Sequence, residues 1–234
     1  MLLYALVVFL SAFLLFLIQP LMGKVLLPWF GGGASIWSAS MMFFQVLLLV
    51  GHTYSHWITE HLSRRRQTWI HLGVLGASVA LVVVTATGWG MPLMPGPEWQ
   101  PQGADSPLLQ ILLILTVSVG LPYFVLSTTS PLLQRWAVHA ASESDPYPLY
   151  ALSNIGSMAA LLAYPLAMQP AFSLPVQSWV WTAGYGLFAV GVGLLAWRQG
   201  RVVLKREVSS ARGEASAPVE APSWMQRGMW LLLS

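Results

Sequence analysis

The chain alternates between long apolar stretches and short polar ones, and the apolar stretches fall into six runs. These runs cover about 2–22, 35–58, 69–89, 107–133, 147–168 and 176–197. A helix of ~20 apolar residues, rising ~1.5 Å per residue, crosses the ~30 Å hydrocarbon core of a bilayer. The pattern therefore predicts an all-α fold, a polytopic membrane bundle with six transmembrane helices over residues 1–197.

The C-terminal residues divide into two further segments of different character. Residues 198–222 begin with several basic side chains and continue with Glu, Ala, Ser and Pro, which is typical of a flexible linker. From residue 223 the chain becomes apolar again, but too few residues follow to cross a bilayer. We expect 223–234 to be the start of a truncated seventh span.

The composition agrees with a membrane protein. Of the 234 residues, 56% are hydrophobic and only 8% are charged, whereas soluble domains carry about 25% charged residues. The mean hydropathy is +0.65. No cysteine is present, which excludes thiol catalysis, disulfides and cysteine-ligated metals. The net charge of +3 indicates basic cytoplasmic loops rather than a nucleic-acid partner. The bilayer is the expected partner, and the sequence indicates no cofactor.

Lys and Arg residues are distributed unevenly over the loops between these runs. The segments after the second, fourth and sixth runs are basic, and those after the third and fifth contain no Lys or Arg. Because positively charged loops stay in the cytoplasm, the sequence predicts a cytoplasmic N-terminus and a cytoplasmic linker in the cell (inner) membrane. Lys24, on the predicted outer side, is the exception.

The stretch Ser118–Trp136 contains two prolines and four consecutive hydroxyl residues, 127–130. A proline inside a helix removes a backbone hydrogen bond, and Ser and Thr side chains can bond back to the freed carbonyls. One interpretation is a proline-kinked helix that these hydroxyls stabilise. The other is a discontinuous helix whose loosened backbone lines a polar cavity.

A first group of candidate substrate-binding residues lies near the predicted cytoplasmic ends of the fourth and fifth runs. It consists of Ser127, Thr128, Thr129, Tyr150, Ser153 and Asn154. Ser153 and Asn154 lie three and four residues after Tyr150, so these residues share one helical face. Such a face can contact a ligand, but hydroxyl and small residues also pack membrane helices together. Both interpretations remain open.

A second group of candidate binding residues lies near the predicted outer side. It consists of Gln19, Lys24, Trp37 and Tyr164, with Gln169 close by. An ionisable residue inside a span indicates a functional site, which favours a binding role for Lys24. A lysine near a helix end can instead extend its ammonium group to the interface.

His52, His56 and Glu60 follow one another at intervals of four, so one helical face carries two imidazoles and a carboxylate. This is a weak metal-site candidate, because the HExxH pattern is absent and no second cluster completes the ligand set. The more economical interpretation is a polar helix end beside Arg64–Arg66, and no metal site is expected.

Three segments carry a resemblance to a known family: QPLMGKVLLPWFGG (19–32), LPYFVLSTTSPLLQRW (121–136) and YPLYALSNIGSMAALLAYP (147–165). They closely resemble the membrane region of the fused major-facilitator/spermidine-synthase family. The resemblance implies a transporter-type helical bundle joined, in the parent chain, to a soluble spermidine-synthase-like domain that these residues do not include. Many relatives have Glu-Pro where this chain has Gln19-Pro20, so an ionisable group is missing here.

Two functional hypotheses follow. The chain is a transporter-like membrane domain that binds or moves a small polar or cationic solute between its helices. Alternatively, it is a non-transporting anchor for a cytoplasmic aminopropyltransferase-like domain, which is missing from this chain. No catalytic constellation occurs in these residues, so any transferase activity would belong to that other domain.

Overall fold

The computed structural model describes residues 1–101, 106–140 and 147–214, and every regular element in these ranges is helical. The elements are α1 (Leu2–Phe30), α2 (Ala34–His61), α3 (Arg64–Trp89), η1 (Pro97–Trp99), α4 (Pro107–Leu115), η2 (Thr116–Gly120), α5 (Leu121–Ala140), α6 (Tyr147–Ala163), η3 (Tyr164–Met168), α7 (Gln169–Ala171) and α8 (Leu174–Glu214). In the described ranges, six helical stretches are long and apolar enough to cross a membrane. The predictions of an all-α fold and of six candidate membrane spans are confirmed.

The chain divides into two compact units, Met1–Ala196 and Trp197–Ser234. The first unit holds the helical bundle. Helix α8 ends at Glu214 and so covers the first part of the expected 198–222 linker, whose flexibility stays a prediction. This part of α8 is rich in residues of high helix propensity, namely Arg, Leu, Lys and Glu, which favours a helical backbone. The expected seventh span, 223–234, lies outside the described residues.

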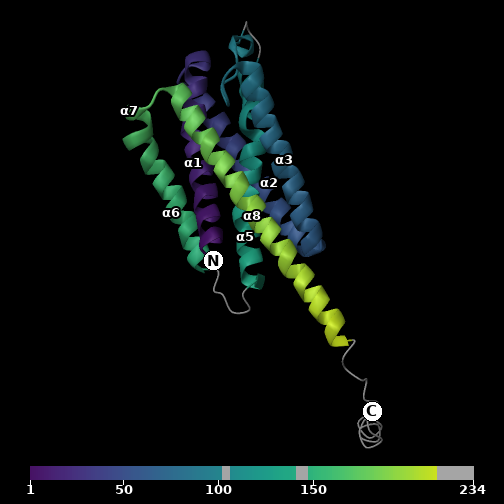
Figure 1. Ribbon diagram of the computed structural model, residues 1–234. Coiled ribbons are helices and arrows are strands. Elements are labelled where there is room, and N and C mark those ends of the chain that lie inside the picture. Colours follow the sequence, from purple (N-terminus) through teal and green to yellow (C-terminus); the bar gives the residue numbers. More distant parts are fainter. Residues whose placement is uncertain (102–105, 141–146, 215–234) are drawn as a thin grey trace, which may run out of the picture. The chain divides into compact units, whose positions relative to one another are not determined.

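Helix α1 is the central element of the first unit. It is apolar around most of its circumference, as expected of a helix surrounded by protein. Figure 1 shows α1 between α6 and α5, and both helices pack along it. From α8, the indole Nε1–H of Trp181 donates a hydrogen bond of 2.9 Å to the Leu14 carbonyl. On α6, a Cβ added at Gly156 would lie 2.7 Å from the Phe9 carbonyl oxygen, so glycine permits this close approach.

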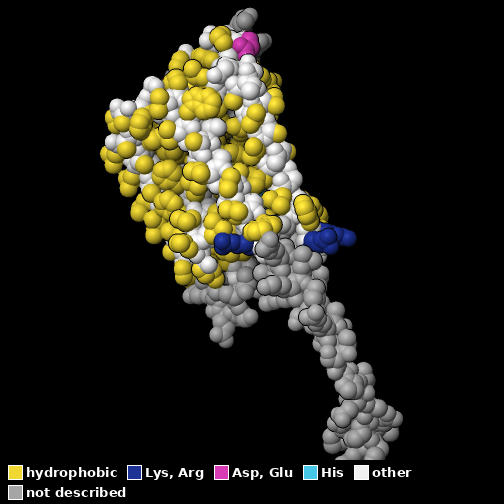
Figure 2. All heavy atoms as spheres, in the orientation of Figure 1, with side chains coloured by type: hydrophobic (Ala, Val, Ile, Leu, Met, Phe, Trp, Pro, Cys, Tyr) yellow, Lys and Arg dark blue, Asp and Glu magenta, His cyan; other side chains and the backbone are white. Residues whose placement is uncertain are grey.

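Short connections make the first helices alternate in direction. The glycines 31–33 form the turn between α1 and α2, and Gly31 has φ of 78°, a backbone conformation that favours glycine. Only Leu62 and Ser63 separate α2 from α3. Figure 2 shows a mainly hydrophobic surface, with basic side chains near one end of the bundle and an acidic one near the other. This surface is suited to lipid contact.

The stretch that contains Pro122 and Pro131 forms one continuous helical path. Helix α4 leads into the π-helical turn η2, which leads directly into α5, and Pro131 lies inside α5. The hydroxyls of Ser127, Thr128 and Thr129 donate to carbonyls three or four residues earlier, at 2.8, 2.8 and 2.6 Å. These contacts favour the interpretation of a kinked helix stabilised by its own hydroxyls over that of a discontinuous one.

Candidate solute-binding site

The residues of the second predicted group lie together around one open pocket of about 450 Å³. The pocket is lined by Gln19, Pro20, Lys24, Leu27, Trp37, Met41, Leu161, Tyr164, Pro165 and Gln169. All five polar or aromatic residues expected on the outer side are among them. The volume falls within the range of about 300–1,000 Å³ that is usual for small-molecule sites.

Three helical faces form this pocket, because the lining residues recur at intervals of about one turn. Helix α1 contributes positions 19, 20, 24 and 27, and α2 contributes 37 and 41. The segment from the end of α6 through η3 to α7 contributes 161, 164, 165 and 169. Residues three or four apart lie on the same side of a helix, so each element presents one continuous stripe to the pocket.

Lys24 is half-buried on α1. Its ammonium group makes no ion pair or hydrogen bond with any residue in the described ranges. Beside it, a Cβ added at Gly23 would lie 2.7 Å from Cη2 of Trp37, so glycine allows the indole to lie against α1. Lys24 and Trp37, a residue that is 39% exposed, both line the pocket.

Gln19 is fixed from the opposite side by α5. Its Nε2–H donates a hydrogen bond of 3.2 Å to the hydroxyl of Tyr123, which is buried. An amide has two N–H groups and a carbonyl oxygen, so Gln19 keeps polar capacity beyond this bond. Its neighbour Pro20 also lines the pocket, and proline inside α1 interrupts the backbone ladder at this depth.

Tyr164 begins the π-helical turn η3, and Pro165 follows it directly. Proline cannot donate a backbone hydrogen bond, and single π-helical turns occur frequently at functional sites. Tyr164 is only 4% exposed, and its hydroxyl is buried without a hydrogen-bond partner. Gln169, one turn further on at the start of α7, is exposed. The pocket lining therefore includes both a buried polar group and an exposed one.

The structure does not gather the first predicted group, which divides between two environments. Ser127, Thr128 and Thr129 are buried, whereas Tyr150 and Asn154 are exposed on α6. A polar contact between α5 and α6 lies in this region, where Oγ of Ser130 is 3.3 Å from Oγ of Ser153. The buried face of α6 carries Gly156 and Ala160, which pack on α1. The face of α6 that packs on α1 therefore contains small residues outside this group.

The buried hydroxyls contact helices that the sequence had not paired with them. Ser55 of α2 donates to the Thr128 carbonyl at 2.8 Å. His71 of α3 lies with Nε2 3.1 Å from Oγ1 of Thr129. Because the Thr129 hydroxyl already donates to Val125, the His71 Nε2–H must donate to Thr129. His71 was missed from the sequence, although the buried positions 67, 71, 78 and 85 form a polar stripe along α3.

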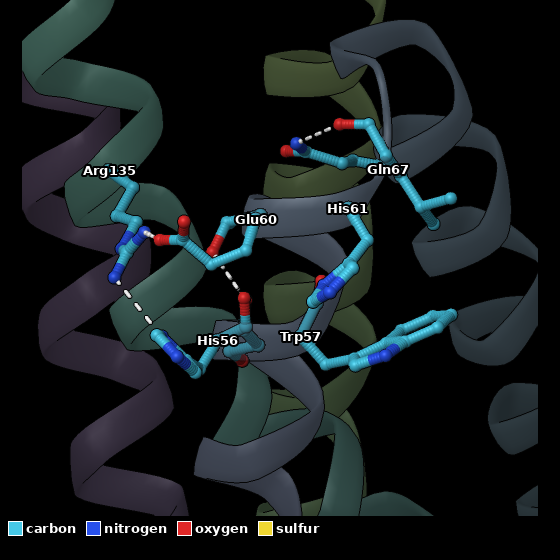
Figure 3. A network of polar contacts seen from close by, with 9 residues as sticks. His56, Trp57, Glu60, His61, Gln67 and Arg135 are labelled. Carbon is cyan, nitrogen blue, oxygen red and sulfur yellow. Dashed lines mark hydrogen bonds and ion pairs between the residues drawn. The ribbon is translucent and has the colours of Figure 1, made fainter.

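At the end of the bundle predicted to be cytoplasmic, α2 and α5 share an ion pair (Figure 3). Nη1 of Arg135 lies 2.8 Å from Oε1 of Glu60, and its Nη2 lies 3.4 Å from Nδ1 of His56. The side chains of the ion pair are about half exposed, so the pair contributes little stability. His52 instead donates to the Leu48 carbonyl of its own helix at 2.9 Å. No group of three metal-ligating side chains forms within the described ranges.

Comparisons with protein-family models, with curated proteins and with solved structures gave no match to this chain. The site must therefore be interpreted from its own residues. It combines one lysine, a buried hydroxyl and two amides with apolar walls, a lining that can bind a small polar group and exclude water from the rest of the molecule that carries it.

Proposed function

We propose that the six-helix unit is a transporter-like, solute-binding membrane domain and that its solute occupies the pocket beside Lys24. The observation that supports this proposal is the convergence of Gln19, Lys24, Trp37, Tyr164 and Gln169 on one open pocket. Residues 150 apart in the sequence supply polar groups to the same small volume. A lipid-facing groove with no ligand does not require such a set.

The backbone around the pocket supports the same proposal. Pro20 of α1 and Pro165 of η3 both line it, and η3 is a π-helical turn. Irregular helices inside membranes are tolerated where they adjoin protein or a water-filled cavity. Transporters commonly bind solutes at interrupted helices. Two interruptions at the same pocket are therefore consistent with a binding site rather than with two independent packing defects.

The proposal includes the family resemblance and the predicted orientation, with the N-terminus in the cytoplasm of a cell (inner) membrane protein. The described lining residues include a lysine and no Asp or Glu. This composition favours a neutral polar or anionic solute over the cationic one expected from the sequence. The alternative function, a membrane anchor for a spermidine-synthase-like domain, needs no solute and therefore no pocket.

The test fills the pocket without changing its charge. Leu161 lines the pocket and is 51% exposed, whereas its neighbour Leu162 is 54% exposed and is not part of the lining. Leu161→Trp should occupy the site, and Leu162→Trp is the matched control. The purified chain in a neutral detergent is screened with small neutral, anionic and cationic solutes, and its thermal unfolding midpoint is measured. A solute at a hundred times its Kd stabilises the folded state by roughly 2.7 kcal/mol.

We expect at least one solute class to raise the unfolding midpoint of the unaltered chain and of Leu162→Trp, but not that of Leu161→Trp. Transport of that solute into proteoliposomes, with the same dependence on Leu161, would extend binding to movement. If no solute stabilises the chain, or if Leu161→Trp responds like its control, the pocket is not a binding site. The anchor function would then be the better interpretation.

A further inference from the structure

We propose that the pocket binds an anionic group, a phosphate or carboxylate, attached to an apolar body, and that Lys24 is its counter-ion. This inference rests on the proposed function, since it names the class of ligand for the same pocket. It is independent of the family resemblance. A lipid headgroup and a small amphiphilic anion share the required chemistry.

The charge of Lys24 is the first observation behind this inference. The residue is half-buried, and its ammonium group has no carboxylate or other polar partner within the described ranges. A charge placed among apolar groups is costly unless it is paired. The other described lining residues carry no Asp or Glu that could pair with it. An anionic ligand would supply the missing partner.

Further hydrogen-bond donors accompany the lysine around the same pocket. The amides of Gln19 and Gln169 each carry two N–H groups. The Tyr164 hydroxyl is buried and without a partner, an arrangement that leaves its donor capacity unused. An oxyanion accepts several hydrogen bonds at once, and those from charged donors are the strongest. A cation would find fewer acceptors here and would be repelled by the ammonium group.

The remaining walls determine what the anion must be attached to. Leu27, Met41, Leu161 and Pro165, with the indole of Trp37, form an apolar surface around the polar groups. Burying this surface requires a ligand with an apolar portion, because a bare phosphate ion would leave it in contact with water. Leu161 and Trp37 are also exposed on the outside of the bundle, so the pocket opens at a surface that lipid can reach. An amphiphilic anion fits both parts of the lining.

Lys24 has a simpler possible role, in which its ammonium group only reaches the membrane interface. That role makes no use of Gln19, Tyr164 or Gln169, and it predicts no selectivity among ligands that share an apolar tail. The two roles therefore differ in a measurable way. The difference is whether binding depends on both the sign of the ligand's charge and the presence of Lys24.

The experiment uses three probes with the same tail: n-hexyl phosphate, n-hexyl glucoside and n-hexyltrimethylammonium. Each is titrated against the full chain in dodecyl maltoside, and unfolding is followed by the fluorescence of the 12 tryptophans. We expect hexyl phosphate to stabilise the chain and hexyltrimethylammonium to have no effect. Lys24→Met and Lys24→Gln should weaken hexyl phosphate binding by about tenfold or more. Lys24→Arg should retain it, because the charge remains. Inorganic phosphate should bind more weakly than hexyl phosphate.

Lipid and solute are distinguished by repeating the titration in nanodiscs. If phosphatidylglycerol stabilises the chain relative to phosphatidylcholine in a Lys24-dependent manner and competes with hexyl phosphate, the anion is a lipid headgroup. If hexyl phosphate binds equally well in both lipids, the anion is a small solute. Either result supports an anion site at Lys24.

Three results would overturn the inference: undiminished hexyl phosphate binding by both Lys24→Met and Lys24→Gln, equal binding of hexyltrimethylammonium, or no response to either hexyl phosphate or phosphatidylglycerol. The Leu161→Trp variant separates this failure from failure of the proposed function. Suppose that a neutral or cationic probe fails to bind Leu161→Trp but still binds Lys24→Met. The proposed solute-binding pocket would then stand, and only its selectivity for anions would be refuted. If no probe depends on Leu161, both proposals fail.

Discussion

Replacing Thr129 by valine should destabilise the bundle more than the same replacement at Thr128. Both side chains are fully buried, and both hydroxyls donate to the Val125 carbonyl. Only Thr129 also accepts a hydrogen bond, from His71 at 3.1 Å. Valine keeps the shape of threonine but removes the hydroxyl, so the pair of variants isolates the contact between α3 and α5.

The expected magnitudes follow from what each replacement leaves behind. A hydrogen bond between membrane helices contributes about 0.6 kcal/mol on average, whereas a buried donor left without an acceptor costs about 1–3 kcal/mol. The Nδ1 atom of His71 already lacks a partner, and Thr129→Val would leave Nε2–H without one as well. We expect a loss of about 1–3 kcal/mol for Thr129→Val and about 0.5 kcal/mol for Thr128→Val.

Unfolding by dodecyl sulfate in mixed micelles, followed by circular dichroism, measures both losses. His71→Phe keeps a ring beside Trp136, which His71 contacts edge-on at a centroid distance of 6.4 Å, while removing the unpaired nitrogen atoms. The double variant Thr129→Val/His71→Phe should therefore lose less than the sum of the single losses, with a coupling of about 1 kcal/mol. Equal losses at 128 and 129, or strict additivity with His71→Phe, would refute the role assigned to this contact.

Three further outcomes follow from the fold. Gly156→Ala should cost ~1–3 kcal/mol in unfolding free energy, because its Cβ would lie 2.7 Å from the Phe9 carbonyl. Gly186→Ala, with no atom within 4 Å, should be neutral or stabilising by up to about 1 kcal/mol; similar losses for the two would contradict the α1–α6 packing. Glu60→Gln should cost less than about 1 kcal/mol, and less still in high salt, since the pair with Arg135 is half exposed; a larger, salt-independent cost would show a buried pair. Reporter fusions after residues 66, 102, 142, 172 and 210 should alternate in, out, in, out, in, and any break would mean a miscounted span.

The membrane spans could be predicted because they depend only on the order of apolar residues along the chain. Length and hydropathy alone locate a helix that must satisfy its own backbone in lipid. The ends were less accurate: the first run was expected to end near residue 22, whereas α1 continues through Pro28 to Phe30. Proline and tryptophan lower the apolar score near an interface without ending a helix there. The π-helical turns η2 and η3 depend on how each proline is accommodated locally, which hydropathy does not report.

The structure places the two predicted groups of site residues differently, for a geometric reason. The position of a side chain depends on how far along its helix it lies and on which face of the helix it occupies. The sequence prediction considered mainly the first of these. Gln19, Lys24 and Tyr164 point to one pocket, whereas Asn154 is exposed on α6 and does not line it. The sequence did indicate which face of α6 is buried, since Gly156 and Ala160 are small residues four apart and their face packs on α1. That face includes neither Tyr150 nor Asn154.

The same sequence signal, a proline within an apolar run, has two structural consequences in this protein. Around Pro131, hydroxyls of the same helix and Ser55 of α2 donate to nearby carbonyls, and the region is closely packed. Around Pro165, the facing helix supplies another proline, Pro20, and the half-buried Lys24, and a pocket remains. A proline thus leads to a pocket where its neighbours do not supply small side chains that donate hydrogen bonds and fill the space. In this protein, two prolines that face one another across a pocket, with an ionisable residue one turn away, therefore indicate a site more specifically than a run of hydroxyls does.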